Sequence, residues 1–327
     1  MKEDAPMRSR LIDLPRRFLT AGLLAVIVAA LMIVATGCGS SSDVGDGGTV
    51  STSTTEVVEA TTTTTTEAPE DTTTTTSAPE TTVTTQPSAD TITLKVYFSK
   101  DEKICAANRV VSKTQQVGAA AMRALLEGPT EAEKTGGMVS NIPKGTTFLG
   151  LAIADGIATV DLSKEYSSGG GSLSMFMRLA EVVFTLTQFP TVQGVNFKLD
   201  GEPIDVLGGE GIIIDHPMTR ADFEDLSPAI LVESPTLGNT VSSPLRVTGT
   251  ANVFEAVFKI EVVNWDGLII AEKVAHATSG TGTRGTFDET VSFTVDKPGL
   301  GALIVSSESG KDGSPINVIE IPLQLEP

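Results

Sequence analysis

Few residues of this 327-residue chain have the types and the spacing that catalysis needs. Asp161 and Glu165 lie four positions apart and best imitate the pair of carboxylates that cleaves a glycosidic bond. Two acids at this spacing beside a strand end are more typical of solvated surface. We therefore assign no catalytic residue and expect that the chain is not an enzyme.

The sequence also contains few residues that could bind a metal ion or act as a reactive thiol. The chain has two Cys and two His, too few for a structural zinc site or a multi-Cys redox centre. His216 and His276 fall in different predicted domains, and neither has a Cys, His or acidic partner at ligand spacing. Cys105 is expected to be a small packing residue rather than a nucleophile. We expect no metal and no cofactor.

Several glycine-rich and acidic segments have a structural and a functional interpretation. Residues 280–285 spell GxGxxG, but a dinucleotide site needs a strand before this motif and a helix after it, so we expect a flexible loop. Residues 169–172 open a predicted helix and favour a plain N-cap over an anion site. Trp265 is expected beside a hairpin or in the core rather than as a ligand platform, and the acids of 222–225 as a soluble linker.

Cys38 is the residue with the clearest chemistry. Basic residues at positions 8–17 precede an apolar run from Leu19 to Ala35, which ends on small residues as an export signal does. The segment Val34–Ser40 resembles a bacterial lipobox, which implies that Cys38 receives a diacylglycerol and becomes the N-terminus. An uncleaved signal anchor and an ordinary cleaved signal remain open, and all three interpretations place the chain outside the cytoplasm.

A low-complexity segment covers residues 39–90. It is rich in Thr, Gly, Ser and Pro and holds nine acidic residues with no Lys or Arg. A chain with so little to bury cannot offset the entropy of ordering, so we predict a disordered, extended linker. Thr-rich stretches with Pro also resemble O-glycosylated stalks.

The first folded domain is predicted over residues 91–223. A strand at 92–98, a helix at 114–127, a hairpin about Asp155-Gly156, a helix from Ser172 and a strand at 195–199 follow in order. This β-α-β-β-α-β order predicts an α+β domain with two helices on one face of a small sheet.

Two patterns in this domain can be checked residue by residue. Asp155-Gly156 is a type I′ turn pair, and folding about it sets apolar residues opposite each other on one face. The pairs are Ile153 with Ala158, Leu151 with Val160 and Leu149 with Leu162. The helix from Ser172 has an apolar stripe at helical spacing that should face the core. Its members are Leu173, Phe176, Met177, Ala180, Val183 and Phe184.

The second folded domain is predicted over residues 228–327. Short strand-like runs recur every 10–15 residues between Ser-Pro, Asp-Gly and Pro-Gly turn signals, and no long helical pattern appears. Seven short strands with this spacing predict an all-β, immunoglobulin-like sandwich without a disulfide. The runs are 230–233, 245–250, 257–263, 268–274, 291–295, 302–306 and 318–325.

Both folded segments resemble known families. The first resembles the sporulation and spore-germination (GerMN) domain, which implies a non-enzymatic envelope module with an α+β fold akin to ring-building domains. Its motifs, in order, are Val96–Ser99, Leu125–Pro129, Asn141–Thr146, Ala158–Ser163, Thr185–Pro190 and Pro217–Phe223. The second resembles the immunoglobulin-like domain of bacterial spore germination. Its motifs are Ser234-Pro235, Ser243–Ala251, Val253–Ala256, Asp266-Gly267 and Lys311–Ser314.

The charge distribution supports the same class of protein. The net charge of −18 argues against a nucleic-acid partner, and positions 91–327, with 18 basic and 29 acidic residues, carry −11. We expect an actinobacterial-type lipoprotein at the outer face of the cytoplasmic membrane, held through diacylglycerol on Cys38, that contacts envelope proteins or cell-wall polymer. The alternatives are a cell-wall hydrolase or its cofactor, and a solute-binding lipoprotein.

Overall fold

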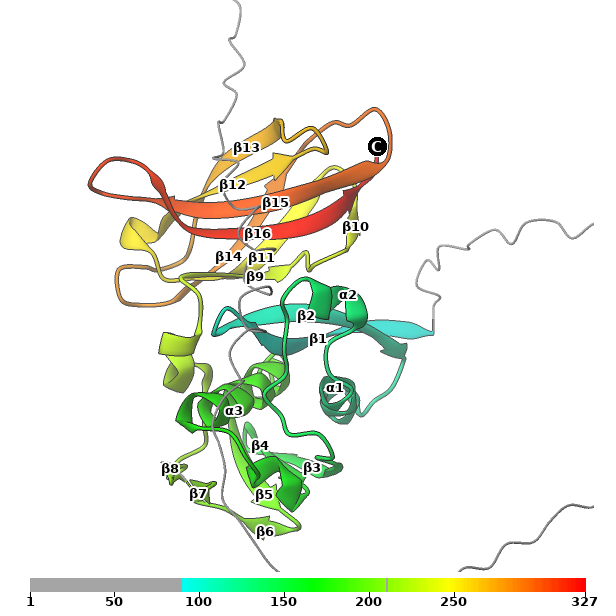
Figure 1. The fold of residues 1–327 in the computed structure, drawn as a ribbon, viewed down its shortest axis with the longest axis vertical. Helices are drawn as coiled ribbons and strands as arrows, with labels where there is room; N and C mark the ends of the chain where they lie inside the picture. Colours follow the sequence, from blue (N-terminus) through cyan, green and yellow to red (C-terminus); the bar gives the residue numbers. More distant parts are fainter. Residues whose placement is uncertain (1–89, 210) are drawn as a thin grey trace, which may run out of the picture. The chain divides into compact units, whose positions relative to one another are not determined.

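A computed structural model describes residues 90–209 and 211–327 (Figure 1). The predicted export signal, Cys38 and nearly all of the predicted linker at 39–90 lie outside these residues. Within the part that is described, none of the helices combines the length and the apolar character needed to cross a membrane.

The N-terminal part has the predicted α+β composition, arranged in three layers. Figure 1 shows the hairpin β1–β2 on one side of α1 and α3 and the sheet β3–β6 on the other side. The elements are β1 (Thr91–Lys100), β2 (Lys103–Ser112), α1 (Val117–Leu126), α2 (Glu131–Thr135), β3 (Phe148–Ala154), β4 (Ile157–Leu162), η1 (Lys164–Ser167), α3 (Ser172–Leu186), β5 (Gly194–Leu199), β6 (Glu202–Pro203), β7 (Val206–Leu207), β8 (Ile212–Ile213) and η2 (Arg220–Leu226).

The sequence analysis does not predict strand β2. With β2 present, the domain has two separate main sheets where one was predicted. Strand β2 pairs antiparallel with β1 as a separate two-stranded sheet. The turn between them is Asp101-Glu102, with φ of +51° and +59°. This left-handed conformation is typical of the pairs Asn-Gly and Asp-Gly, which would have predicted a hairpin. The pair Asp-Glu gives no such sequence signal, so the hairpin was missed.

The outer edge of β1 is covered by side chains of the α3 segment. The backbone N–H of Tyr97 donates to Thr185 Oγ1 at 3.2 Å. Gln188 accepts from the backbone N–H of Lys95 at 2.9 Å and donates to its carbonyl at 2.6 Å. These bonds replace a third strand, which explains why a two-stranded sheet is stable beside the helix.

The hairpin about Asp155-Gly156 forms as predicted, with one difference. Ile153 pairs with Ala158 and Leu151 with Val160, and both turn residues have positive φ. A β-bulge between Phe148 and Gly150 then sets Phe148, not Leu149, opposite Leu162. The predicted third pair is therefore wrong, because the bulge turns Leu149 outwards, where 51 % of its surface is exposed. Beyond the hairpin, β4 pairs in parallel with β5 through the α3 crossover.

Helix α3 is buried on all sides over most of its length. Every residue from Met177 to Leu186 is buried, because β1 packs on one side and the sheet on the other. The first turn differs from the prediction, since Leu173 and Phe176 are exposed. Met175 is buried instead and packs on Gly208, where a Cβ would lie 2.5 Å from Met175 Cε, while Arg178 donates to the Tyr166 carbonyl.

Two buried ionisable side chains on α3 hold loops on either side of the helix. Arg178, 1 % exposed, donates to the carbonyls of Tyr166 at 2.6 Å and Gly169 at 2.9 Å. Glu181, fully buried, accepts from the backbone N–H of Asn141 at 2.9 Å and from Ser140 Oγ at 3.0 Å. Each side chain provides hydrogen-bond partners for buried backbone groups that have lost contact with water.

The C-terminal part is the predicted all-β sandwich. Its sheets have the orders β14-β11-β9 and β10-β16-β15-β12-β13. Phe258 of β12 and Phe287 of β14 meet across the core with ring centroids 4.8 Å apart. The elements are β9 (Ile230–Ser234), β10 (Thr240–Val241), β11 (Leu245–Ala251), η3 (Phe254–Ala256), β12 (Val257–Val263), β13 (Ile269–His276), β14 (Gly285–Val291), β15 (Gly299–Glu308) and β16 (Pro315–Leu325).

One predicted strand of the sandwich is misplaced. The alternation of Val291, Phe293 and Val295 predicted a strand at 291–295, and all three side chains are indeed buried. The hydrogen-bonded strand is β14 over 285–291, which pairs with β11 although its sequence is largely polar. Phe293 and Val295 are buried although the pairing of β14 ends at Val291. The apolar pattern therefore identified core residues but not the strand.

Glu181→Gln is expected to change how stability depends on pH. Burial raises the pKa of the Glu181 carboxyl to about 7, although the bonds from Asn141 and Ser140 and the charge of Arg178 act in the opposite direction. Glu in an unfolded chain has a pKa of about 4.3. The protonated native state therefore contributes stability that is complete below that value and is lost as the pH rises to about 7.

Urea unfolding of the full chain at about pH 5 and about pH 7.5 measures this contribution. The wild type is expected to lose about 2–3 kcal/mol more than E181Q over this interval. The exposed substitution E202Q is the matched control and should follow the wild type. Equal pH dependence in wild type and E181Q would contradict the assignment.

Candidate functional site: the charged junction between the two domains

The two acids that could imitate a hydrolase pair are engaged locally. Asp161 of β4 accepts from the backbone N–H of Gly201 at 3.0 Å. Glu165 lies in η1, and a hydrogen bond from Ser163 lowers the pKa of its carboxyl. Each carboxylate thus supports the backbone or the turn beside it.

His216 has two acidic partners in the structure, although the sequence predicts none at metal-ligand spacing. Its Nδ1 lies 2.7 Å from Asp215 Oδ1, and its Nε2 lies 3.1 Å from Asp222 Oδ1. These hydrogen bonds raise the pKa of the imidazole. Asp222 reaches His216 because it also caps η2 through Thr219, at 2.7 Å, which turns the chain back on itself. Among the described residues, no three His, Cys, Asp or Glu side chains are grouped as a metal site.

Cys105 lies on β2 in a largely buried position. Its thiol donates to the carbonyl of Phe98 across the hairpin, with Sγ 3.5 Å from the oxygen. Burial raises the pKa of the thiol to about 12, although Lys100 acts in the opposite direction. A neutral thiol in this position is a poor nucleophile.

The GxGxxG segment is a loop between β13 and β14, as expected, but its backbone is held in place. Thr281 N–H donates to the carbonyl of Val253 and Gly282 N–H to Asn252 Oδ1, both at 2.9 Å. A Cβ at Gly280 would lie 2.4 Å from the Val253 carbonyl oxygen. The glycine therefore permits close packing of the loop against the segment before η3.

Two further sequence features have structural roles. Gly171 is the N-cap of α3, and the Arg178 side chain holds the preceding loop through the Gly169 carbonyl. The Trp265 ring, 38 % exposed, follows β12 and packs on Gly299, where a Cβ would lie 2.4 Å from the ring. Lys297 Nζ lies 5.2 Å from its ring centroid.

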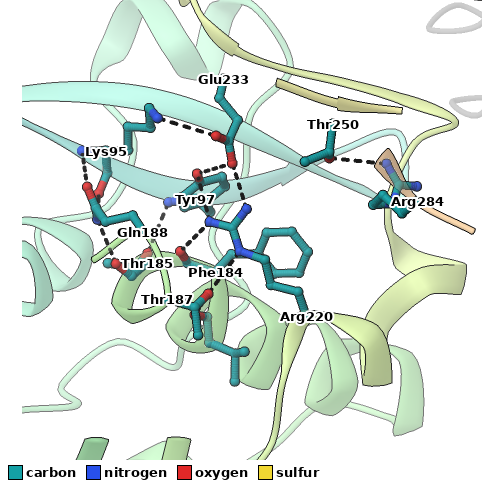
Figure 2. A network of polar contacts seen from close by, with 11 residues as sticks. Lys95, Tyr97, Phe184, Thr185, Thr187, Gln188, Arg220, Glu233, Thr250 and Arg284 are labelled. Carbon is teal, nitrogen blue, oxygen red and sulfur yellow. Dashed lines mark hydrogen bonds and ion pairs between the residues drawn. The ribbon is translucent and has the colours of Figure 1, made fainter. Parts of the chain in front are cut away.

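A network of polar contacts is centred on Arg220, which begins η2 (Figure 2). Its guanidinium donates to Glu233 Oε1 at 2.7 Å and to Tyr97 Oη at 3.2 Å. It also donates to Thr187 Oγ1 at 2.9 Å and to the Phe184 carbonyl at 3.2 Å. The guanidinium lies 4.7 Å from the Phe184 ring centroid, so apolar contact and charge act together.

Glu233 brings the sandwich into this cluster. It comes from β9, and its Oε1 also accepts from Tyr97 Oη at 2.6 Å, while Oε2 faces Lys95 Nζ at 3.3 Å. Leu231, two residues earlier on β9, is 2 % exposed and belongs to the core of the first domain. The first strand of the sandwich is therefore anchored in the GerMN-like part by both a charge and an apolar side chain.

The protonation states in this cluster are well defined. Burial opposes the charge on Glu233, but Arg220 and Lys95 outweigh it and lower the pKa of the carboxyl. Burial raises the pKa of Tyr97 far above its usual value. At neutral pH Glu233 is therefore an anion between the cations Arg220 and Lys95, and Tyr97 is a neutral phenol that donates to Glu233 and accepts from Arg220.

A second ion pair joins the same helix to the sandwich. Arg284 donates to both Glu224 oxygens, at 2.8 and 3.0 Å, and to the carbonyl of Pro228 at 2.9 Å. Glu224 also accepts from Asn252 Nδ2 at 2.8 Å. The acids of 222–225 were expected to form a soluble linker, and this is wrong for Asp222 and Glu224, which are held by partners.

A cavity of about 330 Å³ lies beside this junction. Its walls come from β2, β9, β16 and the segments next to them and are mainly apolar, with Cys105, Met138, Leu237 and Ile319 among them. This volume is at the lower end of the range for small-molecule sites.

Only part of this site could be predicted from the sequence. Arg220 lies inside a quoted motif, Pro217–Phe223, and Tyr97, Thr185, Thr187 and Gln188 lie inside others. Glu233 and Arg284 were missed, because their partners lie 13 and 60 positions away and no local pattern links them.

The comparisons identify both domains. Residues 95–205 match the family described as "Sporulation and spore germination", and residues 229–314 match "Immunoglobulin-like domain of bacterial spore germination". The chain thus carries a GerMN domain followed by an immunoglobulin-like domain of the spore-germination type. Helix η2, with Arg220 and Glu224, lies between the two matched segments.

A curated relative and several solved structures are similar to parts of the chain. Lipoprotein LpqB of Thermobifida fusca (strain YX) is 27 % identical over 125 residues, which cover 38 % of this chain and 19 % of LpqB. The chain therefore spans about a fifth of the length of this relative.

Among solved structures, the first GerMN domain of the sporulation protein GerM from Bacillus subtilis has a TM-score of 0.34, is 22 % identical, and covers 40 % of this chain and 99 % of that one. The tandem GerMN domains of the same protein have a TM-score of 0.36, are 16 % identical, and cover 63 % of both chains. A putative lipoprotein from Clostridium perfringens has a TM-score of 0.30, is 29 % identical, and covers 44 % and 97 %.

Arg220→Met is expected to destabilise the chain strongly. The substitution keeps the length of the side chain but leaves Glu233, 13 % exposed, without its closest cation. Removing one partner of a buried pair costs about 3 kcal/mol. The additional change Glu233→Gln removes the uncompensated charge and should recover part of the loss.

Chemical denaturation of the full chain measures this effect. The control is Arg246→Met, which breaks the pair with Asp288, where both side chains are more than half exposed, and should change stability little. An R220M chain as stable as the R246M chain would show that the Arg220 cluster does not hold the two domains.

Proposed function

We propose that the chain is a non-catalytic binding or scaffold module of the cell envelope, tethered through diacylglycerol on Cys38. The domains proposed are the signal and lipobox at 1–38, the linker at 39–90, the GerMN domain at 91–223 and the sandwich at 228–327. The partners proposed are the membrane and envelope proteins or cell-wall polymer, at the outer face of the cytoplasmic membrane.

The observation that carries this proposal is the junction. Two ion pairs and a shared apolar contact connect the domains, so a partner meets one combined surface rather than two independent modules. A binding module gains from such preorganisation, because less conformational entropy is lost when the partner binds. The similarity to a protein named as a lipoprotein supports the membrane anchor.

The polar residues of the family motifs support a non-catalytic role. Thr185, Thr187 and Gln188 are engaged with β1 and Arg220, and Asn141 donates to Glu181. These side chains serve contacts inside the domain. The motifs are thus explained by the fold without a substrate.

Cys38→Ala is expected to release the full chain from the membrane. A diacylated chain partitions with membranes because each buried methylene contributes about 0.8 kcal/mol. Cell fractionation, with mass spectrometry of the N-terminal peptide, should find the wild type lipidated in membranes and the C38A chain outside them. A wild-type chain that keeps residues 1–37 and carries no diacylglycerol would contradict the proposal and indicate a signal anchor.

The hydrolase alternative has its own test. Asp161→Asn combined with Glu165→Gln removes both candidate acids and keeps their size. Muropeptide release by cells that carry the variant is expected to equal that of the wild type, with circular dichroism as the control for folding. A drop in release by a folded variant would contradict the proposal and favour the hydrolase class.

A further inference from the structure

Strand β2 has an open outer edge at the side of the first domain that meets the sandwich (Figure 1). It pairs with β1, and no other strand in the described part of the chain pairs with it. On β1, the backbone N–H groups of Tyr97 and Ser99 point away from β2, because they donate to other segments. Residues opposite each other in an antiparallel pair share this direction. The backbone groups of their partners, Ala106 and Ile104, therefore point away from β1.

These outward backbone groups are shielded from water. Ile104 is 1 % exposed and Ala106 is 5 % exposed, and both residues line the cavity of about 330 Å³ beside the junction. Nearly all N–H and C=O groups that are buried in a protein have a hydrogen-bond partner. A buried edge with which no strand pairs therefore has the capacity to bind one.

Strand β16 has a second open edge at the same cavity. Its residues Val318–Ile321 line the cavity, and β10 pairs with it only at its C-terminal end. The carbonyl of Pro322 accepts from the backbone N–H of Gly238 at 2.8 Å, so the backbone groups of Pro322 point away from β15. Directions alternate along a strand, and the pairing with β15 is regular on both sides of Glu320. The backbone groups of Glu320 therefore also point away from β15.

The cavity has the shape and the chemistry of a slot for a peptide. Four consecutive residues of each strand line it, Lys103–Ala106 and Val318–Ile321, which is about 13 Å of extended chain. Consecutive residues include both faces of a strand, so the cavity lies along the edge of each one. Its other walls are mainly apolar, with Met138, Ile230 and Leu237 among them. The cavity thus offers hydrogen bonds to a main chain and apolar surface to alternate side chains.

The charged residues around the cavity balance each other. Lys100 and Lys103 contribute two positive charges, and Asp101 and Glu320 contribute two negative charges. A balanced rim favours an uncharged ligand over a strongly acidic or basic one. An acyl chain would fill the apolar part of the cavity but would leave the backbone groups of both edges without partners. A peptide main chain satisfies both requirements.

We propose that this cavity binds an extended, uncharged peptide segment of a partner protein as a strand added between β2 and β16. Its main chain forms hydrogen bonds with Ile104 and Ala106 at one edge and with Glu320 at the other. Alternate side chains enter the apolar part of the cavity. The inference rests on the proposed binding function, to which it gives a site and a class of partner.

Fluorescence anisotropy with the full chain tests this inference. The probes are a pool of labelled eight-residue peptides in which Val, Ile or Leu alternates with Ser or Thr, with blocked termini so that they carry no charge. Members of this pool are expected to bind. The tightest binder is then remade with N-methyl groups at its odd or at its even positions. An added strand between two edges uses N–H groups on both sides, so each version is expected to bind at least about tenfold more weakly.

Glu320→Pro tests the site from the side of the chain. The substitution removes an N–H that points away from β15, so the pairing with β15 is kept, as it is at Pro322. Peptide binding is expected to weaken about five- to tenfold, which is the effect of losing one hydrogen bond. Glu320→Gln removes the same charge and keeps the N–H, so it is the matched control and should bind like the wild type. Circular dichroism checks that both variants fold.

Amide hydrogen exchange of the wild-type chain gives a measurement that needs no substitution. Bound peptide is expected to slow exchange at Ile104, Ala106 and Glu320. Exchange in β13, the far edge of the sheet that contains β16, should not change.

Four results would overturn the site. They are a pool without a binder, an N-methylated peptide that binds as tightly as its parent, equal weakening by E320P and E320Q, and binding without slower exchange at the two edges. The membrane anchor and the non-catalytic role would stand in each case, because the variants described for them test those claims separately.

Discussion

The contact on which the arrangement of the two domains depends is the buried ion pair between Arg220 and Glu233. Removing both charges from water is costly, and the cost is offset only when each has several partners in good geometry. Tyr97, Thr187 and the Phe184 carbonyl complete the shell of Arg220. Tyr97 comes from β1, and Thr187 and Phe184 come from the end of α3. Because Glu233 comes from β9, the ion pair constrains how these three segments meet.

Hydrogen bonds inside the domain also account for the polar residues of the family motifs. Thr185 and Gln188 complete the hydrogen bonds of β1, and Thr187 accepts from Arg220, so one short segment at the end of α3 serves both the sheet and the junction. Arg178 and Glu181 hold two loops from the same helix.

Local patterns predicted what local physics determines. Asp155-Gly156 located a hairpin and most of its register, and alternating apolar runs located the sandwich. The prediction failed where distant segments decide the outcome. Strand β2 has a turn without glycine, α3 is buried from two sides rather than one, and Glu224 finds Arg284 60 positions away. The resemblance to known families identified Arg220 within a motif, but not the partner on β9 that gives it a role.

The rigidity of the junction can be measured directly by the distance distribution between spin labels on the two domains. Glu202→Cys on β6 and Val274→Cys on β13, both at exposed positions, provide the labels in a chain with Cys38→Ala and Cys105→Ser. The account predicts one narrow distribution for this chain and a clearly broader one when Arg220→Met is added. A broad distribution in the chain with Arg220 intact, or no change on its removal, would contradict a junction held by the buried pair.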